Sequence, residues 1–237
     1  MSNKLILLEI FSRTLFFVRK NIIHCFIFLL LLVMLKAIPE EHMIVSFFMS
    51  LTVLGYVLKG ILILLDNDKI SINKIFEVIT FRTLVGYLLA ISPLFILVIL
   101  PFLISLGVSR ISSTIQNDPS TGGALFLLLY PLFQLVFLLL FLILPYVIFT
   151  LLSIFDNQKL SLKGHFVESW AILKISKKVY ILILIISIIS ALLVIPFLKL
   201  LGNFGTTIVG SSNLLLSAIA ITVLYKISKE ELNARLR

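Results

Sequence analysis

The sequence predicts an all-α membrane protein, a six-transmembrane-helix bundle with two parallel hairpin repeats and interfacial cytoplasmic helices. Three observations lead to this fold class. The 237-residue chain is 60% hydrophobic and only 13% charged, whereas soluble domains carry about 25% charged residues. Its apolar residues gather in long runs, and a polar motif recurs at an offset of 90 residues. Lipid is the solvent that this composition requires, so residues 1–237 are predicted to form a single integral membrane domain.

Six apolar stretches are long enough to cross a bilayer as helices, since a hydrocarbon core of about 30 Å needs about 20 mostly apolar residues. They cover residues 22–38, 43–65, 83–108, 124–154, 179–201 and 208–225. Helices are predicted because the runs lack the alternation of a barrel strand. The fourth stretch is long, so we expect it to tilt or to bend at Pro131 or Pro145.

The distribution of basic residues predicts the orientation. Of the 20 Lys and Arg residues, sixteen lie before the first span, in the second and fourth loops, or after the last span. Arg110 alone lies on the other side, and three lysines fall inside spans. Cytoplasmic loops carry the excess of Lys and Arg, so both termini are predicted to be cytoplasmic. The net charge of +9 therefore indicates contact with anionic lipid headgroups, and no nucleic acid is expected as a partner.

An internal repeat relates residues 56–103 to residues 146–198. An Asp-Asn-x-Lys-x-Ser motif begins at Asp66 and again at Asp156, in each copy at the same distance after a Tyr-Val pair. Two crossings separate the copies, so both units run the same way through the membrane. Such repeats occur in transporters, with sites at the repeat interface. A duplication that only builds a stable bundle explains the pattern as well.

The segment after the second Asp-Asn turn is predicted to be an interfacial helix. Ser161 is a good N-cap, and an apolar stripe follows it on one helical face, with basic residues opposite. The stripe consists of Leu162, Phe166, Trp170 and Leu173. Such a helix lies with its stripe in the acyl boundary, so Phe166, Trp170 and Lys174 are candidate interfacial residues. The alternative is a helix extension packed on the bundle.

Polar residues inside the predicted spans are the best candidates for function. Lys59 lies about two turns inside the cytoplasmic boundary and can extend its amine outward. Gln134 and Asn213 lie deeper, where we expect them to bond across helices. Convergence of these three residues around one cavity would favour a transport pathway.

No pattern of catalytic or metal-binding residues is found. The three histidines, His24, His42 and His165, do not form His-Glu-x-x-His. The single Cys25 allows neither a disulfide within the chain nor a thiolate metal site. The acids of the Asp-Asn turns are too few to hold divalent cations. The sequence therefore predicts neither an enzyme nor a bound cofactor, and a membrane enzyme of lipid metabolism ranks third among the functions considered.

The order of several motifs resembles the YciC-like family of bacterial inner-membrane proteins. These motifs are Arg19-Lys20-Asn21, the helix over 55–65, Leu144-Pro145-Tyr146, Glu168-Ser169-Trp170 and Ser212-Asn213-Leu214. The likeness covers most of the chain, and a looser one extends to the membrane domain of some glycerophosphodiester phosphodiesterases. Family members often have a longer outer loop than residues 39–42. The resemblance implies a multi-pass protein of the bacterial inner membrane and carries over no catalytic residues.

The function expected from these observations is a non-enzymatic scaffold or accessory factor in envelope or lipid upkeep. Its partners would be the bilayer, anionic headgroups at the cytoplasmic face, and a membrane protein that the sequence does not identify. The alternative is a transporter or permease subunit with a pathway between the two repeats.

The predicted topology can be tested with a reporter that is active only in the cytoplasm. Fused after Arg237, the reporter should be active, because sixteen basic residues place that end inside. Fused within residues 117–123, it should be silent. The opposite result at either position would contradict the six-span assignment.

Overall fold

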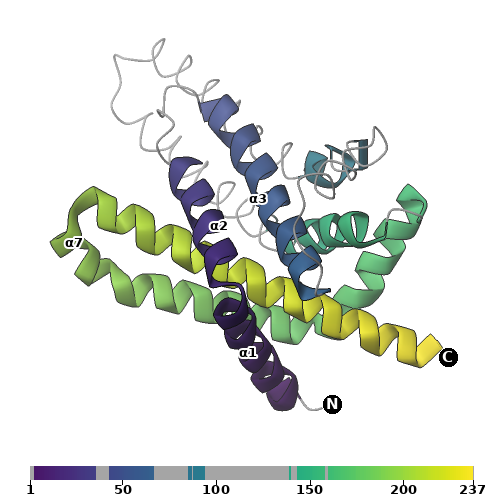
Figure 1. The fold of residues 1–237 in the computed structure, drawn as a ribbon. Coiled ribbons are helices and arrows are strands. Elements are labelled where there is room, and N and C mark those ends of the chain that lie inside the picture. Colours follow the sequence, from purple (N-terminus) through teal and green to yellow (C-terminus); the bar gives the residue numbers. More distant parts are fainter. Residues whose placement is uncertain are drawn as a thin grey trace, which may run out of the picture.

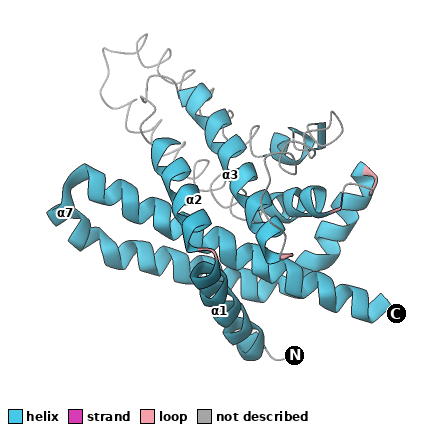
Figure 2. Cartoon of the chain, viewed as in Figure 1, coloured by secondary structure: helices cyan, strands magenta, loops and turns pink. Residues whose placement is uncertain are grey.

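The computed structural model describes residues 3–35, 43–66, 85–86, 88–93, 139, 143–157 and 160–236, and helices are the only regular elements in these ranges (Figure 2). The longer elements are α1 (Asn3–Lys20), α2 (Ile22–Leu35), α3 (Met43–Leu65), an apolar helix over Ile143–Asp156, and α7 (Leu162–Leu236). The all-helical class predicted from the sequence is confirmed for these ranges.

Helix α7 is a long hairpin. Gly202 breaks it with a φ of 65° and a ψ of −168°, a conformation that glycine adopts without the steric cost of a Cβ. The two arms run back alongside each other from this turn (Figure 1). The sequence predicts an outer loop over residues 202–207, but Gly205 already belongs to the second helix, Gly205–Leu236.

Helices α1, α2 and α3 all pack against α7. The centre of the core is aromatic: the ring of Phe149 lies 5.6 Å from that of Tyr180 and 6.3 Å from that of Tyr225, measured between centroids. These three side chains come from the Ile143–Asp156 helix and from the two arms of α7, and all are buried. Residues of α1, α2 and α3, among them Phe28, Val57 and Ile61, belong to the same core.

Several predicted spans coincide with helices. Helix α3 has the predicted bounds, and α2, described over Ile22–Leu35, begins at the predicted Ile22. The segments predicted as the fifth and sixth spans lie in the two arms of α7, and the second arm continues to Leu236, well past the predicted end at Tyr225. The predicted span over 83–108, most of that over 124–154 and the short helix expected after Ser71 lie outside the described residues.

Among the described helices, Gly205–Leu236 is long and apolar enough to cross a membrane by itself. Helices α1 and α2 meet this criterion only as a pair, and they are bent by 93° relative to each other. The structure thus contains one clear candidate for a membrane-crossing helix. The six-helix bundle and the two repeats stay predictions.

The close approach of α2 and α3 depends on Gly60. A Cβ at this position would lie 2.5 Å from Cζ of Phe28, and the Phe28 ring is itself buried. Gly60→Ala should therefore lower the thermal unfolding temperature in detergent, with a cost of about 1–3 kcal/mol for overpacking. In a Phe28→Leu background the same change should cost little, because the shorter side chain leaves room for the methyl group. Equal losses in both backgrounds would contradict this packing.

Candidate functional site: a charged cluster at the Asp-Asn turns

The Asp156 carboxylate is the centre of a cluster of charged side chains. Oδ1 lies 2.6 Å from Nζ of Lys226, and Oδ2 lies 2.8 Å from Nζ of Lys229. The hydroxyl of Tyr225 donates a third bond to Oδ2, at 3.3 Å. Only 10% of the Asp156 side chain is exposed. A carboxylate of the second Asp-Asn turn is thus held by one face of the C-terminal arm.

Lys226 joins the two Asp-Asn turns. Besides its bond to Asp156, its amine lies 2.9 Å from Oδ1 of Asp66 in the first turn. One ammonium group therefore binds the corresponding carboxylates of both copies of the motif. Lys59 adds a further link, since its amine donates to the carbonyl of Phe155 at 2.5 Å and so connects α3 to the end of the Ile143–Asp156 helix.

Lys229 extends the cluster to the first turns of α7. Its amine lies 3.0 Å from Oε1 of Glu168, and the other carboxylate oxygen of Glu168 accepts a hydrogen bond from the hydroxyl of Ser153. The Ser153 oxygen lies 3.0 Å from Nδ1 of His165. Because that hydroxyl already donates to Glu168, the shared proton of this contact comes from Nδ1. Ser153 and His165 are buried.

The sequence places both lysines on the inward face of α7. Residues spaced three or four apart share a helical face, and one row of buried positions on this arm follows that spacing. The row consists of Ser211, Leu215, Ala218, Thr222 and Tyr225. Lys226 and Lys229 continue the face, and their side chains are only 20% and 17% exposed. Two of the sixteen basic residues assigned to the cytoplasmic rim are therefore turned into the protein.

Asp156 is stabilised in its ionised form. Burial alone would raise its pKa, but the hydrogen bonds and positive charges of Lys226 and Lys229 outweigh burial and hold the pKa below its usual range. The Asp156 carboxylate thus does more than shape its own turn, because it binds side chains 70 and 73 residues away.

The cluster has the chemistry of a structural ion-pair network. In the described part of the chain, no three His, Cys, Asp or Glu side chains are placed to share a metal ion. The Ser153 hydroxyl is fully buried and gives its proton to Glu168 rather than to His165, so it is not arranged as a nucleophile beside a general base. The two lysines supply the positive charge that the three carboxylates require.

A second polar group lies between the two arms of α7. The side-chain amide of Asn213 donates to the carbonyl of Ser187 at 3.0 Å, and its oxygen accepts from Ser190 at 3.0 Å. The Ser187 and Ser217 hydroxyls are 2.8 Å apart. Asn213 therefore bonds across helices, as the sequence predicts. Small polar side chains with such bonds are typical of close contacts between membrane helices.

The candidate in-membrane residues Lys59 and Asn213 belong to different groups. Lys59 lies at the charged cluster, whereas Asn213 precedes Lys226 by 13 residues on the same arm, about 20 Å at about 1.5 Å per residue. Gln134 lies outside the described residues.

The candidate interfacial residues lie at the start of α7. The cap is confirmed: the amide of Gly164 donates to Oγ of Ser161 at 3.0 Å. Phe166 stacks on Tyr146 with ring centroids 6.1 Å apart, and Trp170 is 54% exposed. The Lys174 amine lies 5.8 Å from the centroid of the Trp170 ring.

This segment continues without a break into the predicted fifth span, which is the form expected of the alternative, a helix extension packed on the bundle. A stripe of largely polar residues faces the protein interior, and none of the four residues of the predicted apolar stripe is buried. The buried residues are His165, Ser169, Ile172 and Ser176.

The sequence analysis did not identify Glu168, Lys226, Lys229 and Ser153 as parts of a site. The available signal was the spacing of Thr222, Tyr225 and Lys229, which puts a lysine on the buried face of a helix. A lysine on a buried face requires a carboxylate as partner. The two Asp-Asn turns, which repeat at an offset of 90 residues, supply two candidate carboxylates, those of Asp66 and Asp156.

Comparisons of the chain with protein-family models, with curated proteins and with solved structures gave no match. The fold of the described residues therefore defines the class: they are all helical and include one helix that is long and apolar enough to cross a membrane by itself. The likeness to the YciC-like family stays an expectation.

Asp156→Asn should lower the free energy of unfolding by about 1.5–3 kcal/mol at neutral pH, because two largely buried lysines lose their shared carboxylate and keep only Asp66 and Glu168 as partners. The ionised carboxylate stabilises the fold above its unfolded pKa of about 3.9, and this advantage is lost as the pH falls through the lower folded value. The thermal unfolding temperatures of the parent and the variant should thus differ above roughly pH 4 and become equal as the pH falls below it.

Asp66→Asn is the matched control, since 51% of the Asp66 side chain is exposed and exposed pairs contribute about 0–1 kcal/mol. Equal losses for the two variants, or a difference that does not change with pH, would contradict the central place of Asp156.

Proposed function

We propose that the protein is a multi-pass inner-membrane scaffold or accessory factor in envelope or lipid upkeep, and that it performs no reaction itself. One observation carries the proposal: the charged cluster binds the two Asp-Asn turns to the C-terminal arm. Its carboxylates and ammonium groups are engaged with one another at 2.6–3.0 Å. Groups engaged in this way hold helices together and are not presented to a substrate.

The outward surface of α7 supports a membrane location. Up to Lys178 the exposed side chains include lysines and the single tryptophan, and between Val179 and Ser190 the exposed side chains are aliphatic. The first set is Lys163, Val167, Trp170, Lys174, Lys177 and Lys178, and the second is Ile181, Leu182, Ile185, Ile186, Ile188 and Ile189. Basic and aromatic residues mark the membrane–water boundary. The exposed surface changes from basic and aromatic to aliphatic at the residue where the predicted fifth span begins.

The outward surface of α2 follows the same order. Arg19 and Lys20 are exposed just before α2, and the exposed side chains of α2 are then apolar. These are Ile22, Ile23, Phe26, Ile27, Leu30, Leu31 and Met34. An exposed apolar surface of this extent is costly in water, and lipid removes the cost.

The alternative is a transporter or permease subunit. The polar group of Asn213, Ser187, Ser190 and Ser217 favours it, because polar side chains inside a span often mark a pathway. The group bonds within the α7 hairpin, however, and Lys59 lies far from it. The structure-forming role is therefore preferred.

The two functions can be separated with the double variant Asp156→Asn/Lys226→Gln, tested in a strain that lacks the endogenous protein. The variant removes one charge of each sign and keeps hydrogen-bonding side chains, and the Lys229–Glu168 pair stays intact. A scaffold needs only the fold, so the double variant should restore lipid composition and envelope permeability in that strain. Metabolite uptake should be the same with and without the protein.

Lys226→Gln alone is the control, because it leaves the acids in excess and should reduce the amount of folded protein. A double variant that is folded and abundant but fails to restore the envelope, or an uptake defect in the deletion strain, would contradict the scaffold proposal and favour transport.

A further inference from the structure

Helix α1 is apolar on two sides. Ile6, Ile10 and Phe17 are buried in the main core, but the rest of the helix is not simply polar. Five other large apolar side chains of α1 are each more than half exposed: Leu5, Leu8, Phe11, Leu15 and Phe16. A helix that is apolar on most of its surface is stable only where lipid or another apolar surface covers the side that faces away from the core.

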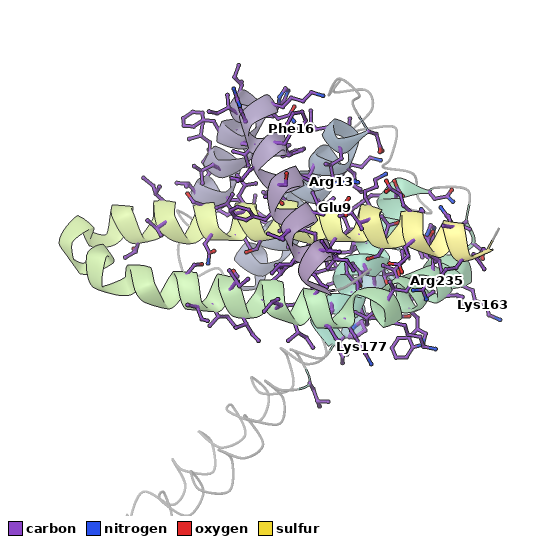
Figure 3. All side chains as sticks on the ribbon, turned by 90° about the horizontal axis from the view of Figure 1, so that it is seen from below. Glu9, Arg13, Phe16, Lys163, Lys177 and Arg235 are labelled. Atoms are coloured by element: carbon purple, nitrogen blue, oxygen red, sulfur yellow. The ribbon has the colours of Figure 1, made fainter. Side chains whose placement is uncertain are left out.

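Three charged residues of α1 form a polar strip. At 3.6 residues per turn, Glu9, Arg13 and Lys20 fall on one line along the helix, and Phe11 and Leu15 fall on the opposite side, together with Lys4. Ser12 and Arg19 fall between the strip and that side. Arg13 bonds Glu9 at 2.7 Å. Figure 3 shows these two side chains next to each other where α1 crosses the arms of α7.

The orientation of α1 follows from its junction with α2. The chain turns by 93° around Asn21, whose amide and side chain both donate to the carbonyl of Phe17, at 2.9 and 3.1 Å. Under the proposed function α2 crosses the membrane, so a helix at 93° to it lies nearly in the membrane plane.

The depth of α1 follows from its contact with α7. Nη1 of Arg13 lies 4.0 Å from Oε2 of Glu230, and Glu230 is five residues beyond Tyr225, the predicted end of the sixth span. At about 1.5 Å per residue this is about 7.5 Å outside the hydrocarbon core, which is the depth of the headgroups.

We propose that α1 is an interfacial helix that binds the anionic surface of the cytoplasmic leaflet, with Phe11 and Leu15 at the acyl boundary and the Glu9–Arg13 strip toward water. This inference rests on the proposed membrane location. Charge complementarity selects the occupant: α1 carries Lys4, Arg13, Arg19 and Lys20 against the single acid Glu9. Basic residues next to an anionic membrane surface are attracted to it.

The test places a fluorescent label at single cysteines in the full-length protein, reconstituted in vesicles with and without phosphatidylglycerol. Cys25 is the only native cysteine, so Cys25→Ser gives a cysteine-free background. Phe11→Cys reports on the apolar side, Arg13→Cys on the polar strip, and Leu30→Cys on the exposed surface of α2. A label at position 11 should be quenched by lipid with a shallow acyl quencher and protected from an aqueous one. A label at position 13 should show the reverse.

Phosphatidylglycerol should increase the shallow quenching at position 11 at least twofold, and Arg19→Gln/Lys20→Gln should remove the increase. If the label at position 11 is quenched from water and the label at position 30 is quenched by lipid, the inference about α1 is overturned and the proposed membrane location still stands. Aqueous quenching at both positions would overturn the proposed membrane location as well. Protection of position 11 from both quenchers would mean that another protein surface covers α1, and this outcome would also overturn the inference.

Discussion

The ion pairs between Asp156 and the two lysines of the C-terminal arm are the contacts on which the rest of the structure depends. Burying two ammonium groups on one helical face without carboxylates would cost free energy. A carboxylate as buried as Asp156 likewise requires positive partners. Their distances of 2.6 and 2.8 Å leave little freedom. The register of the C-terminal arm against the Ile143–Asp156 helix is therefore set by charge, and the aromatic core beneath it packs in that register.

A cluster of this kind gives specificity more than stability. The desolvation of two lysines and three acids offsets much of the attraction between them, and apolar substitutes often give equal or greater stability. Apolar side chains alone would, however, let the arms of α7 slide past the other helices, since Leu and Ile fit many positions. Asp66 and Asp156 accept only a position that brings Lys226 between them.

Several features of the fold could be predicted from the sequence because they depend on local pattern. The bounds of α3 follow from an apolar run between polar residues, and the cap at Ser161 follows from a single side chain. The charged cluster could not be predicted in this way, because Lys226 lies 160 residues from Asp66 and counting it as a cytoplasmic charge ignores the direction of its side chain. Helix α1 was missed for another reason: its apolar residues lie on two sides and its polar residues are spread around the helix, so the sequence shows no clear periodicity.

The position of the lysines near the end of the chain has a consequence for biosynthesis. Asp66 and Asp156 are made 160 and 70 residues before Lys226, so both turns are synthesised before their common partner. The ion pairs that join the turns to the C-terminal arm can therefore form only after almost the whole chain has been made. A chain that ends before Lys226 leaves Asp156 without either of its lysines.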